Sequence, residues 1–360
     1  MVRVAVAGAG AFGRNHLRVY RELEAAGLGV SLVAAIEPDS ARAADAEARY
    51  GIPVFATAEE LLAADLRLDA VSVAVPTLHH HLVASVLLEA GIDLLVEKPL
   101  AGSLDEADDL IARSERGARI LQVGHLERFN PAVLAVQPRL KRPMFFEAHR
   151  LSIFTPRSLD VDVVLDLMIH DLDIVLTFAA SPVREVRAVG LPILSPKVDI
   201  ANVRVEFESG CVANFTASRV STERVRKLRF FEPRQYVSID YARRELLVIR
   251  LESGVPGTLP PEIAALLASG KADPAVLAQL AAAGGNHPSP GLTFVKPEVA
   301  PGEPLRLEIE SFLGSVRTRK APRVTARQGR AALALALEIQ STMVAHAHRA
   351  GLGDFFEPEQ

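Results

Sequence analysis

Four polar side chains interrupt the otherwise apolar stretch VVLDLMIHDLDIVL at residues 163–176. On an α-helix, Asp166, His170 and Asp173 would share one stripe because of their spacing, while Asp171 would lie about 100° from His170. A surface helix can also carry a polar stripe, but such faces are usually rich in lysine, arginine or glutamate, which this stretch lacks. Short carboxylates and one imidazole among apolar residues predict a pocket lining, in which the carboxylates need partners.

Lys98 is a candidate partner for these carboxylates, because it ends the apolar, strand-like run LLVEKPL. In open α/β sheets, ligands bind at the carboxyl ends of such strands. Pro99 restricts Lys98 to extended conformations, so the lysine leaves the strand in a defined direction. The competing interpretation is a lysine that merely ends a strand.

The segment GAGAFG places Gly8, Gly10 and Gly13 in the G-x-G-x-x-G spacing, with Ala11 and Phe12 between the last two. It follows a predicted strand and opens a predicted helix, which is the context that this pattern requires. The glycines allow a tight turn and a close approach of the backbone to a pyrophosphate at the helix N-terminus. All five residues are therefore predicted to bind a dinucleotide.

Glu37 ends the second strand-like run, SLVAAIE. A carboxylate at this position accepts hydrogen bonds from the adenosine ribose and repels a 2′-phosphate, which favours NAD over NADP. Arg42 is close enough in the sequence to keep NADP open. The alternative to a dinucleotide site is an ordinary glycine turn followed by a glutamate exposed to solvent, with no cofactor.

The elements that must position these groups change in character near residue 124. Residues 1–124 alternate helical segments with apolar runs, and the hydroxyls of Thr57 and Ser103 precede glutamates as in a capping box. Runs without polar alternation are typical of parallel strands covered on both faces. An α/β Rossmann domain with a doubly wound parallel sheet is expected from the runs VRVAVAG, SLVAAIE, AVSVAVP, DLLVEKP and RILQVG.

Residues 125–360 are expected to form an α+β domain with an open-faced, mainly antiparallel sheet. Residues 253–304 are rich in alanine, proline and glycine and are interpreted as an insertion, partly mobile, while Thr325 caps a final helix. The expected strands are MFFEAHRLSI, VREVRAVGL, ANVRVEFE, CVANFTASRV, RKLRFF, YVSIDY and ELLVIRL.

Composition excludes several classes of protein. The chain has 360 residues and a net charge of −4, which favours two domains and argues against nucleic-acid binding. One cysteine, Cys211, excludes an intrachain disulfide and fits a reducing compartment. No apolar run reaches the roughly 18 residues of a membrane span, and the short apolar stretch at the start leads into the glycine turn rather than resembling a secretory signal. A cytoplasmic location without a membrane partner is expected.

The glycine pattern, the segment AVPTLHHHLVASVLLEAGIDLLVEKPL and the D-x-x-x-H helix together resemble the glucose–fructose oxidoreductase/inositol dehydrogenase (Gfo/Idh/MocA) family. The resemblance covers residues 1 to about 250 and again PLRLEIESFLGSVRTRKAPRVT. It implies an NAD(P)-dependent oxidoreductase, with NAD favoured here, that forms a homodimer or homotetramer through the open sheet. By the same resemblance, cofactor-binding residues are Val75, Pro76, Thr77, His80, Glu97 and Lys98, the last also being the active-site lysine.

Three consecutive histidines, His79 to His81, invite a metal-site interpretation. Neighbouring side chains on a helix point about 100° apart, so they do not converge on one ion. No metal site is predicted.

Oxidation of an alcohol requires a base for the hydroxyl proton while hydride moves to the nicotinamide. An imidazole, with a pKa of about 6.5, suits this role, whereas the pKa of a lysine, about 10.4, would have to be lowered. We therefore predict His170 as the general base, Lys98 as the hydrogen-bond donor to the reacting oxygen, and Asp166 as the residue that orients one or both. Exchanged roles of the lysine and the histidine remain an alternative.

The segment VGHLERFNPAV follows the fifth strand, and His125, Arg128 and Asn130 in it are predicted, with Asp173, to bind substrate. A helix-entry loop with solvated charges is the other interpretation. Together with the D-x-x-x-H helix, this segment is similar to a subgroup that oxidises C3 of UDP-N-acetylglucosamine for a partner aminotransferase, leading to diamino sugars of lipid A or related glycans. The sequence LDVDVV stands where many relatives have a glycine-rich stretch.

Other functions stay open. The substrate could be a UDP-N-acetylglucosaminuronate, another sugar or inositol, or the chain could be a non-catalytic NAD-binding sugar sensor. Retention of Lys98, Asp166 and His170 together argues against the sensor. The basic segment RVSTERVRKLRFFEPR, residues 219–234, could bind a diphosphate, but the solvated face of a strand is the favoured interpretation.

Overall fold

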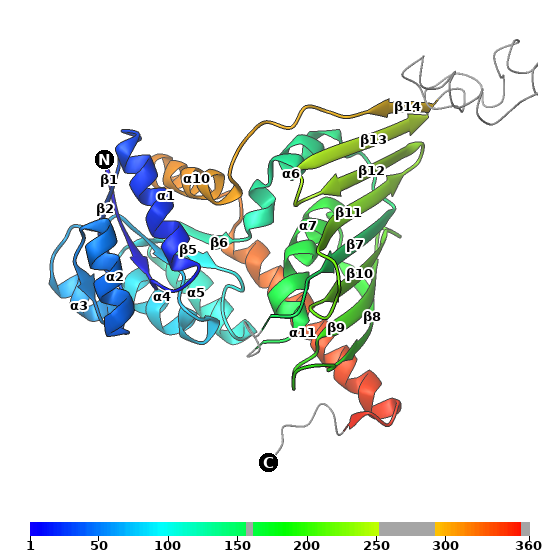
Figure 1. Ribbon diagram of the computed structural model, residues 1–360, viewed down its shortest axis with the longest axis horizontal. Helices are drawn as coiled ribbons and strands as arrows, with labels where there is room; N and C mark the ends of the chain where they lie inside the picture. Colours follow the sequence, from blue (N-terminus) through cyan, green and yellow to red (C-terminus); the bar gives the residue numbers. More distant parts are fainter. Residues whose placement is uncertain (156–160, 252–291, 354–360) are drawn as a thin grey trace, which may run out of the picture.

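The computed structural model describes residues 1–155, 161–251 and 292–353. Two sheets dominate it, one at each side of Figure 1, with helices between them. Each sheet corresponds to one of the two regions distinguished in the sequence.

The first sheet has six parallel strands in the order β3-β2-β1-β4-β5-β6. This is the strand order of a Rossmann domain, so the predicted doubly wound sheet is confirmed. Only β3 was not predicted, because it is a two-residue edge strand. The strands are β1 (Val2–Ala7), β2 (Val30–Ile36), β3 (Val54–Phe55), β4 (Ala70–Val73), β5 (Asp93–Glu97) and β6 (Leu121–Gly124).

Helices connect these strands, and the predicted start signals are confirmed. The hydroxyls of Thr57 and Ser103 each accept a hydrogen bond from the backbone N–H three residues later, at 3.2 Å. Such bonds satisfy donors that the first helical turn leaves free. The helices are α1 (Gly13–Ala25), α2 (Ser40–Tyr50), α3 (Ala58–Ala63), η1 (Thr77–His79), α4 (His80–Glu89) and α5 (Leu104–Arg116).

The second sheet has eight strands in the order β14-β13-β12-β11-β7-β10-β9-β8. All neighbours are antiparallel except β7 and β10, which run parallel. Part of the predicted insertion forms the edge strand β14. Residues 252–291 lie outside the described residues, so the prediction that the insertion is partly mobile is not tested. The strands are β7 (Phe145–Leu151), β8 (Val183–Leu191), β9 (Ile200–Phe207), β10 (Val212–Ser218), β11 (Val225–Glu232), β12 (Gln235–Asp240), β13 (Glu245–Leu251) and β14 (Leu292–Val295).

One face of this sheet is covered and the other is open. Phe146, Phe215 and Phe230 on the covered face pack in one core with residues of α7 and α11. Along β7, buried residues alternate with partly exposed ones, as expected for a sheet with one solvated face. The remaining helices are η2 (Leu126–Phe129), α6 (Pro131–Val136), η3 (Gln137–Arg139), η4 (Val164–Met168), α7 (Ile169–Ala179), α10 (Pro304–Thr318) and α11 (Ala326–Arg349).

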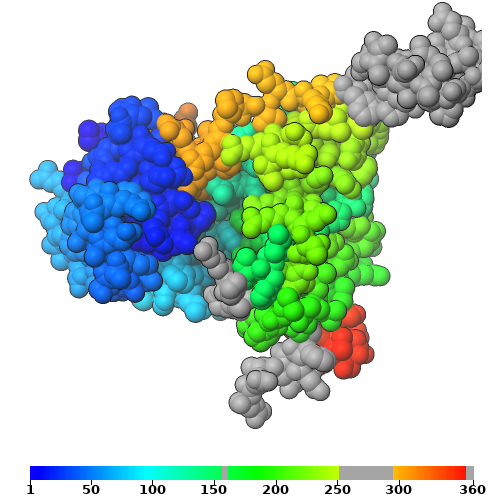
Figure 2. Space-filling view, in the orientation of Figure 1, coloured from blue at the N-terminus to red at the C-terminus, as the bar shows by residue number. Residues whose placement is uncertain are grey.

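Two C-terminal helices tie the sheets together. Helix α10 packs against the first domain, where Ile309 and Phe312 join the core around Leu17. Figure 2 shows this segment, in orange, against the blue first domain. Helix α11 runs from the first domain along the second sheet (Figure 1), and its Leu333 and Ile339 belong to the cores of the first and second domains respectively. In space, therefore, the first domain includes residues from beyond position 124.

Within the described ranges, none of the helices is both long enough and apolar enough to cross a membrane.

We expect Phe312→Ala to lower the free energy of unfolding by about 3–5 kcal/mol, because the side chain is fully buried in the first core and its removal leaves a cavity. Urea denaturation followed by circular dichroism measures this. The matched control is Glu310→Ala on the same helix. Its side chain is 37% exposed and forms an ion pair with Arg306, so its loss should change the free energy of unfolding by no more than about 0.5 kcal/mol. Equal effects of the two changes would show that α10 does not stabilise the first domain.

Candidate active site

The glycine turn between β1 and α1 has the shape that a dinucleotide needs. Gly8 has a φ of +95°, and a Cβ on Gly13 would lie 1.8 Å from the carbonyl oxygen of Gly8, so glycine is required at both positions. A Cβ on Gly10 would meet nothing within 4 Å, which leaves open space beside the backbone. No side chain caps the start of α1, and its first turn carries no acid. This end of the helix, with neither a capping side chain nor an acid, therefore fits a pyrophosphate.

Glu37 lies at the end of β2 and is held in place by three donors. Its carboxylate accepts hydrogen bonds from the N–H groups of Ala9 (2.8 Å) and Asp39 (3.1 Å) and from Arg42 (2.8 Å). Burial would raise the pKa of Glu37, but the bonds from Arg42, Ala9 and Asp39 outweigh it and lower the pKa. The ionised carboxylate fits the ribose hydroxyls of NAD, and Arg42 is already paired.

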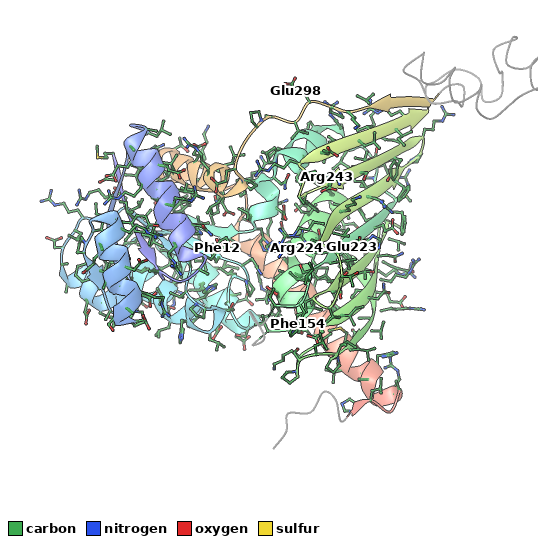
Figure 3. All side chains as sticks on the ribbon, viewed as in Figure 1. Phe12, Phe154, Glu223, Arg224, Arg243 and Glu298 are labelled. Atoms are coloured by element: carbon green, nitrogen blue, oxygen red, sulfur yellow. The ribbon has the colours of Figure 1, made fainter. Side chains whose placement is uncertain are left out.

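A cleft of about 490 Å³ lies at the carboxyl edge of the first sheet and extends to η4 and the second sheet. Phe12, at the tip of α1, points toward the second domain (Figure 3) and lines this cleft. The loops after β4, β5 and β6 all contribute, as expected for open α/β sheets, which bind ligands at the carboxyl ends of their strands. The predicted residues on its walls are Phe12, Val75, Pro76, Thr77, His80, Glu97, Lys98, Asp166 and His170.

Lys98 reaches across the cleft to the main chain of η4. Its Nζ donates to the carbonyl oxygens of Asp166 (2.8 Å) and Leu165 (3.3 Å). The expected partnership of Lys98 with the carboxylate of Asp166 is thus corrected, since no ion pair joins them in the described part of the chain. Burial lowers the pKa of Lys98, although the negative charges of Asp166 and Glu97 oppose the shift.

The local helix differs from the α-helix assumed in the sequence prediction. Residues 164–168 form a π-helical turn, with α-helix from Ile169 onward. Such turns are wider than α-helix and are frequent at functional sites. Asp166 and His170 line the cleft, whereas Asp173 does not. The predicted single stripe of three residues is therefore reduced to two.

His170 presents one ring edge to the cleft. Its Nδ1 is buried and finds no hydrogen-bond partner among the described residues, whereas Nε2 is not among the buried atoms. Burial, followed by the positive charges of Lys98 and Arg150, holds the pKa of His170 well below its usual value. The imidazole is therefore neutral at pH 7 and able to accept a proton.

The other carboxylates of the stretch hold buried arginines. Asp171 accepts two hydrogen bonds from Arg150, at 2.7 and 3.1 Å, and Arg150 also donates to Glu127 at 3.1 Å. Asp173 pairs with Arg128 at 3.4 Å. These charges therefore compensate one another in an environment where an unpaired charge is costly.

Arg150 and Glu127 line the cleft but were not among the predicted site residues. A signal for Arg150 existed, because the alternation of β7 places it on the covered face together with Phe146 and Ala148. A charged residue in register with core residues implies a buried partner.

The predicted substrate-binding residues His125, Arg128, Asn130 and Asp173 lie outside the cleft lining, in a buried layer beneath it. Asn130 caps α6 and donates to Glu127 at 3.0 Å and to the carbonyl of Tyr241 at 3.2 Å. The segment LERFN does lie at the cleft. Its Glu127 lines the cleft wall, whereas Arg128 and Asn130 do not.

Two of the three consecutive histidines, His80 and His81, contact different parts of the chain, and His79 is exposed. The two ring nitrogens of His80 lie 2.9 Å from the carbonyl oxygens of Val75 and Pro99, so this buried side chain joins two walls of the cleft. His81 instead contacts Asp109, at 2.7 Å. Within the described ranges, no group of three or more histidine, cysteine or acidic side chains has the arrangement of a metal site.

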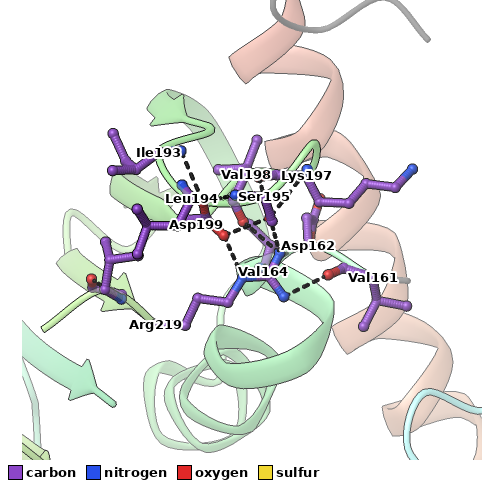
Figure 4. A network of polar contacts seen from close by, with 12 residues as sticks. Val161, Asp162, Val164, Ile193, Leu194, Ser195, Lys197, Val198, Asp199 and Arg219 are labelled. Carbon is purple, nitrogen blue, oxygen red and sulfur yellow. Dashed lines mark hydrogen bonds and ion pairs between the residues drawn. The ribbon is translucent and has the colours of Figure 1, made fainter. Parts of the chain in front are cut away.

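A buried ion pair fixes the chain where it enters η4 (Figure 4). Asp199 accepts hydrogen bonds from three consecutive backbone N–H groups of residues 193–195, at 2.6–2.9 Å, and from Arg219 at 2.7 Å. Burial would raise the pKa of Asp199, but these bonds lower it to about 2. Arg219 also donates to the carbonyl of Val161 at 2.9 Å, which anchors the segment that carries Asp166 and His170.

Comparisons with known proteins agree with this geometry. Residues 2–125 match the oxidoreductase family with an NAD-binding Rossmann fold, and residues 133–234 match the GFO/IDH/MocA C-terminal domain. The chain is 32% identical over 350 residues to UDP-N-acetylglucosamine 3-dehydrogenase of Acidithiobacillus ferrooxidans, covering 97% of this chain and 99% of that protein.

A solved structure and one further relative agree. A solved structure of the Acidithiobacillus ferrooxidans enzyme covers 95% of this chain and 97% of its own, with 32% identity and a TM-score of 0.80. The scyllo-inositol 2-dehydrogenase (NAD(+)) of Bacillus subtilis is 28% identical over 235 residues, covering 61% of this chain and 68% of that protein. With its glycine turn and its second, open-faced sheet, the chain belongs to the Gfo/Idh/MocA family of NAD-binding oxidoreductases.

Proposed function

We propose that the protein oxidises the C3 hydroxyl of UDP-N-acetylglucosamine to a 3-keto sugar, with NAD as the cofactor. The observation that carries the proposal is the meeting of Lys98 and a neutral His170 on one cleft beside the dinucleotide turn. The near full-length sequence similarity to a UDP-N-acetylglucosamine 3-dehydrogenase supports this substrate over inositol, since the sequence match to the Bacillus subtilis scyllo-inositol 2-dehydrogenase covers 61% of the chain.

In this proposal, His170 Nε2 accepts the proton of the C3 hydroxyl as the C–H bond breaks. Bound NAD supplies the acceptor for the hydride, so the alcohol loses one hydride and one proton and becomes a ketone. Two of the three donor positions of the Lys98 ammonium are directed to the carbonyls of η4, which leaves one for the reacting oxygen. The carboxylate of Asp166 contributes a negative charge that keeps Lys98 protonated.

We further propose a cytoplasmic homo-oligomer whose product goes to an aminotransferase in lipopolysaccharide or surface glycan biosynthesis. The open face of the second sheet supports the oligomer, because it carries partly exposed aromatic rings in contact with one another, namely Phe145, Phe231 and Tyr236. A 3-keto sugar is the chemical group that transamination needs, which supports the pathway.

Incubation with NAD and UDP-N-acetylglucosamine should give a nucleotide sugar that has lost two hydrogen atoms, detected by mass spectrometry. His170→Asn should lower kcat by about 10²–10⁴-fold, the contribution of a general base, with little change in NAD affinity. Circular dichroism of His170→Asn and wild type checks that the variant is folded. If UDP-N-acetylglucosamine is not oxidised but inositol is, the inositol dehydrogenase alternative is favoured. If no sugar is oxidised, the sensor is favoured.

The pH profile of kcat/KM separates the two assignments of base. A His170 base must be neutral, and its pKa lies well below the usual value of about 6.5. Activity should then persist as the pH falls through about 6.5 and decline only below it. It should also decline at high pH, starting below the usual lysine pKa of about 10.4, as Lys98 loses the proton that it donates. A rate that keeps rising with pH would assign the base role to Lys98.

Glu37→Ser should shift cofactor preference toward NADP. The change removes the acceptor for the ribose hydroxyls and frees Arg42, which is paired with Glu37 at 2.8 Å, to bind a 2′-phosphate. The ratio of kcat/KM for NADP to that for NAD, measured with both cofactors, should rise at least tenfold, or about 1.4 kcal/mol. The double change Glu37→Ser with Arg42→Ala should lose the gain, and an unchanged ratio in the single variant would remove Glu37 from cofactor selection.

A further inference from the structure

The basic segment at residues 219–234 is divided by strand β11 between the two faces of the second sheet. Leu228 and Phe230 are fully buried on the covered face, and Arg226, two residues before Leu228, shares that face. Lys227 and Arg229 alternate onto the open face, where they pair with Asp240 and Glu147. Of these three basic residues of β11, only Arg226 lines the cleft.

Arg226 lies directly beside Arg150 in the ladder between β11 and β7. The charge of Arg150 is compensated by Asp171 and Glu127, with which it forms three hydrogen bonds. The side chain of Arg226, in contrast, has no hydrogen bond or ion pair among the described residues, and it is exposed where it lines the cleft. Burial and then the charge of Arg150 lower the pKa of Arg226.

The exposed guanidinium of Arg226, with no side-chain partner in the described ranges, is available to an anionic ligand in the cleft. Its planar fork matches two phosphate oxygens at once. Arg226 also acts electrostatically on His170, so an anion bound to Arg226 would lie close to the base. The dinucleotide pyrophosphate has its own site at the glycine turn, on the other side of the cleft.

We infer that Arg226 is the subsite for the diphosphate of a nucleotide-sugar substrate. The inference rests on the proposed function, in which the diphosphate is attached to C1 of the sugar, two ring carbons from the C3 hydroxyl. Binding at Arg226 then holds the sugar ring between the phosphate and His170. Arg226 thus selects nucleotide sugars over free sugars and inositols, which carry no phosphate.

The test is the steady-state kinetics of Arg226→Gln with UDP-N-acetylglucosamine. Loss of a charge-assisted, bidentate contact should raise KM for the nucleotide sugar about tenfold to hundredfold, with kcat nearly unchanged. Arg226→Lys keeps the charge without the fork and should fall between wild type and Arg226→Gln. The matched control Arg229→Gln, from the open face of the same strand, should leave this KM unchanged.

The outcomes separate this subsite from its alternatives. An unchanged KM for UDP-N-acetylglucosamine in Arg226→Gln would overturn the inference, and so would a rise only in KM for NAD, which would assign Arg226 to the cofactor. Wild-type KM for the nucleotide sugar should also rise with ionic strength, a readout that does not depend on the folding of any variant.

A separate measurement distinguishes failure of the subsite from failure of the proposed function. Calorimetric titration of UDP into wild type and Arg226→Gln, both saturated with NAD, should show weaker binding to the variant. If wild type does not oxidise UDP-N-acetylglucosamine but the variant still binds UDP more weakly, the subsite stands and the proposed reaction fails. Equal UDP affinities would overturn the subsite whatever the reaction is.

Discussion

The contact between the Lys98 ammonium and the main-chain carbonyls of η4 is the interaction on which the site depends. It joins the end of strand β5 in the first domain to the π-helical turn of the second, across the cleft. The lysine ends a buried strand and the turn is anchored by the ion pair of Asp199 with Arg219, so both sides of the contact are fixed by their own domain. The ammonium charge adds to burial, the main cause, in lowering the pKa of His170. One cross-domain contact therefore joins the two walls of the site and contributes to keeping its base neutral.

Much of the fold could be predicted because its signals are local. Apolar runs, glycine spacing and helix caps identified five of the six Rossmann strands and most of the second sheet. Of the two missed edge strands, β3 has only two residues, and β14 lies in the segment rich in alanine, proline and glycine that was interpreted as an insertion. The packing of α10 on the first domain could not be predicted from such signals, because it joins residues almost 300 positions apart in sequence, as in the pair Arg18–Glu303.

The sequence predicted which residues form the candidate site better than it predicted the contacts that these residues make. Lys98, Asp166 and His170 do meet on one cleft. The π-turn and the choice of a carbonyl rather than a carboxylate partner for Lys98 depend on tertiary packing, which helical spacing does not encode. His125, Arg128, Asn130 and Asp173 were chosen for polarity near the site, but polar groups also form the buried layer that supports Glu127 and Arg150. Closeness in sequence does not distinguish residues that line the cleft from residues in the buried layer. The alternation of a strand can do so, as it does for Arg150 on β7.

Helix α11 contributes to both hydrophobic cores through side chains less than two turns apart, with Leu333 in one and Ile339 in the other. A single continuous helix of this kind acts as a strut, because any large rotation of one domain against the other would pull one of its faces out of a core. Such a strut predicts a cleft of nearly constant width, into which ligands pass through the open mouth rather than by the opening and closing of whole domains.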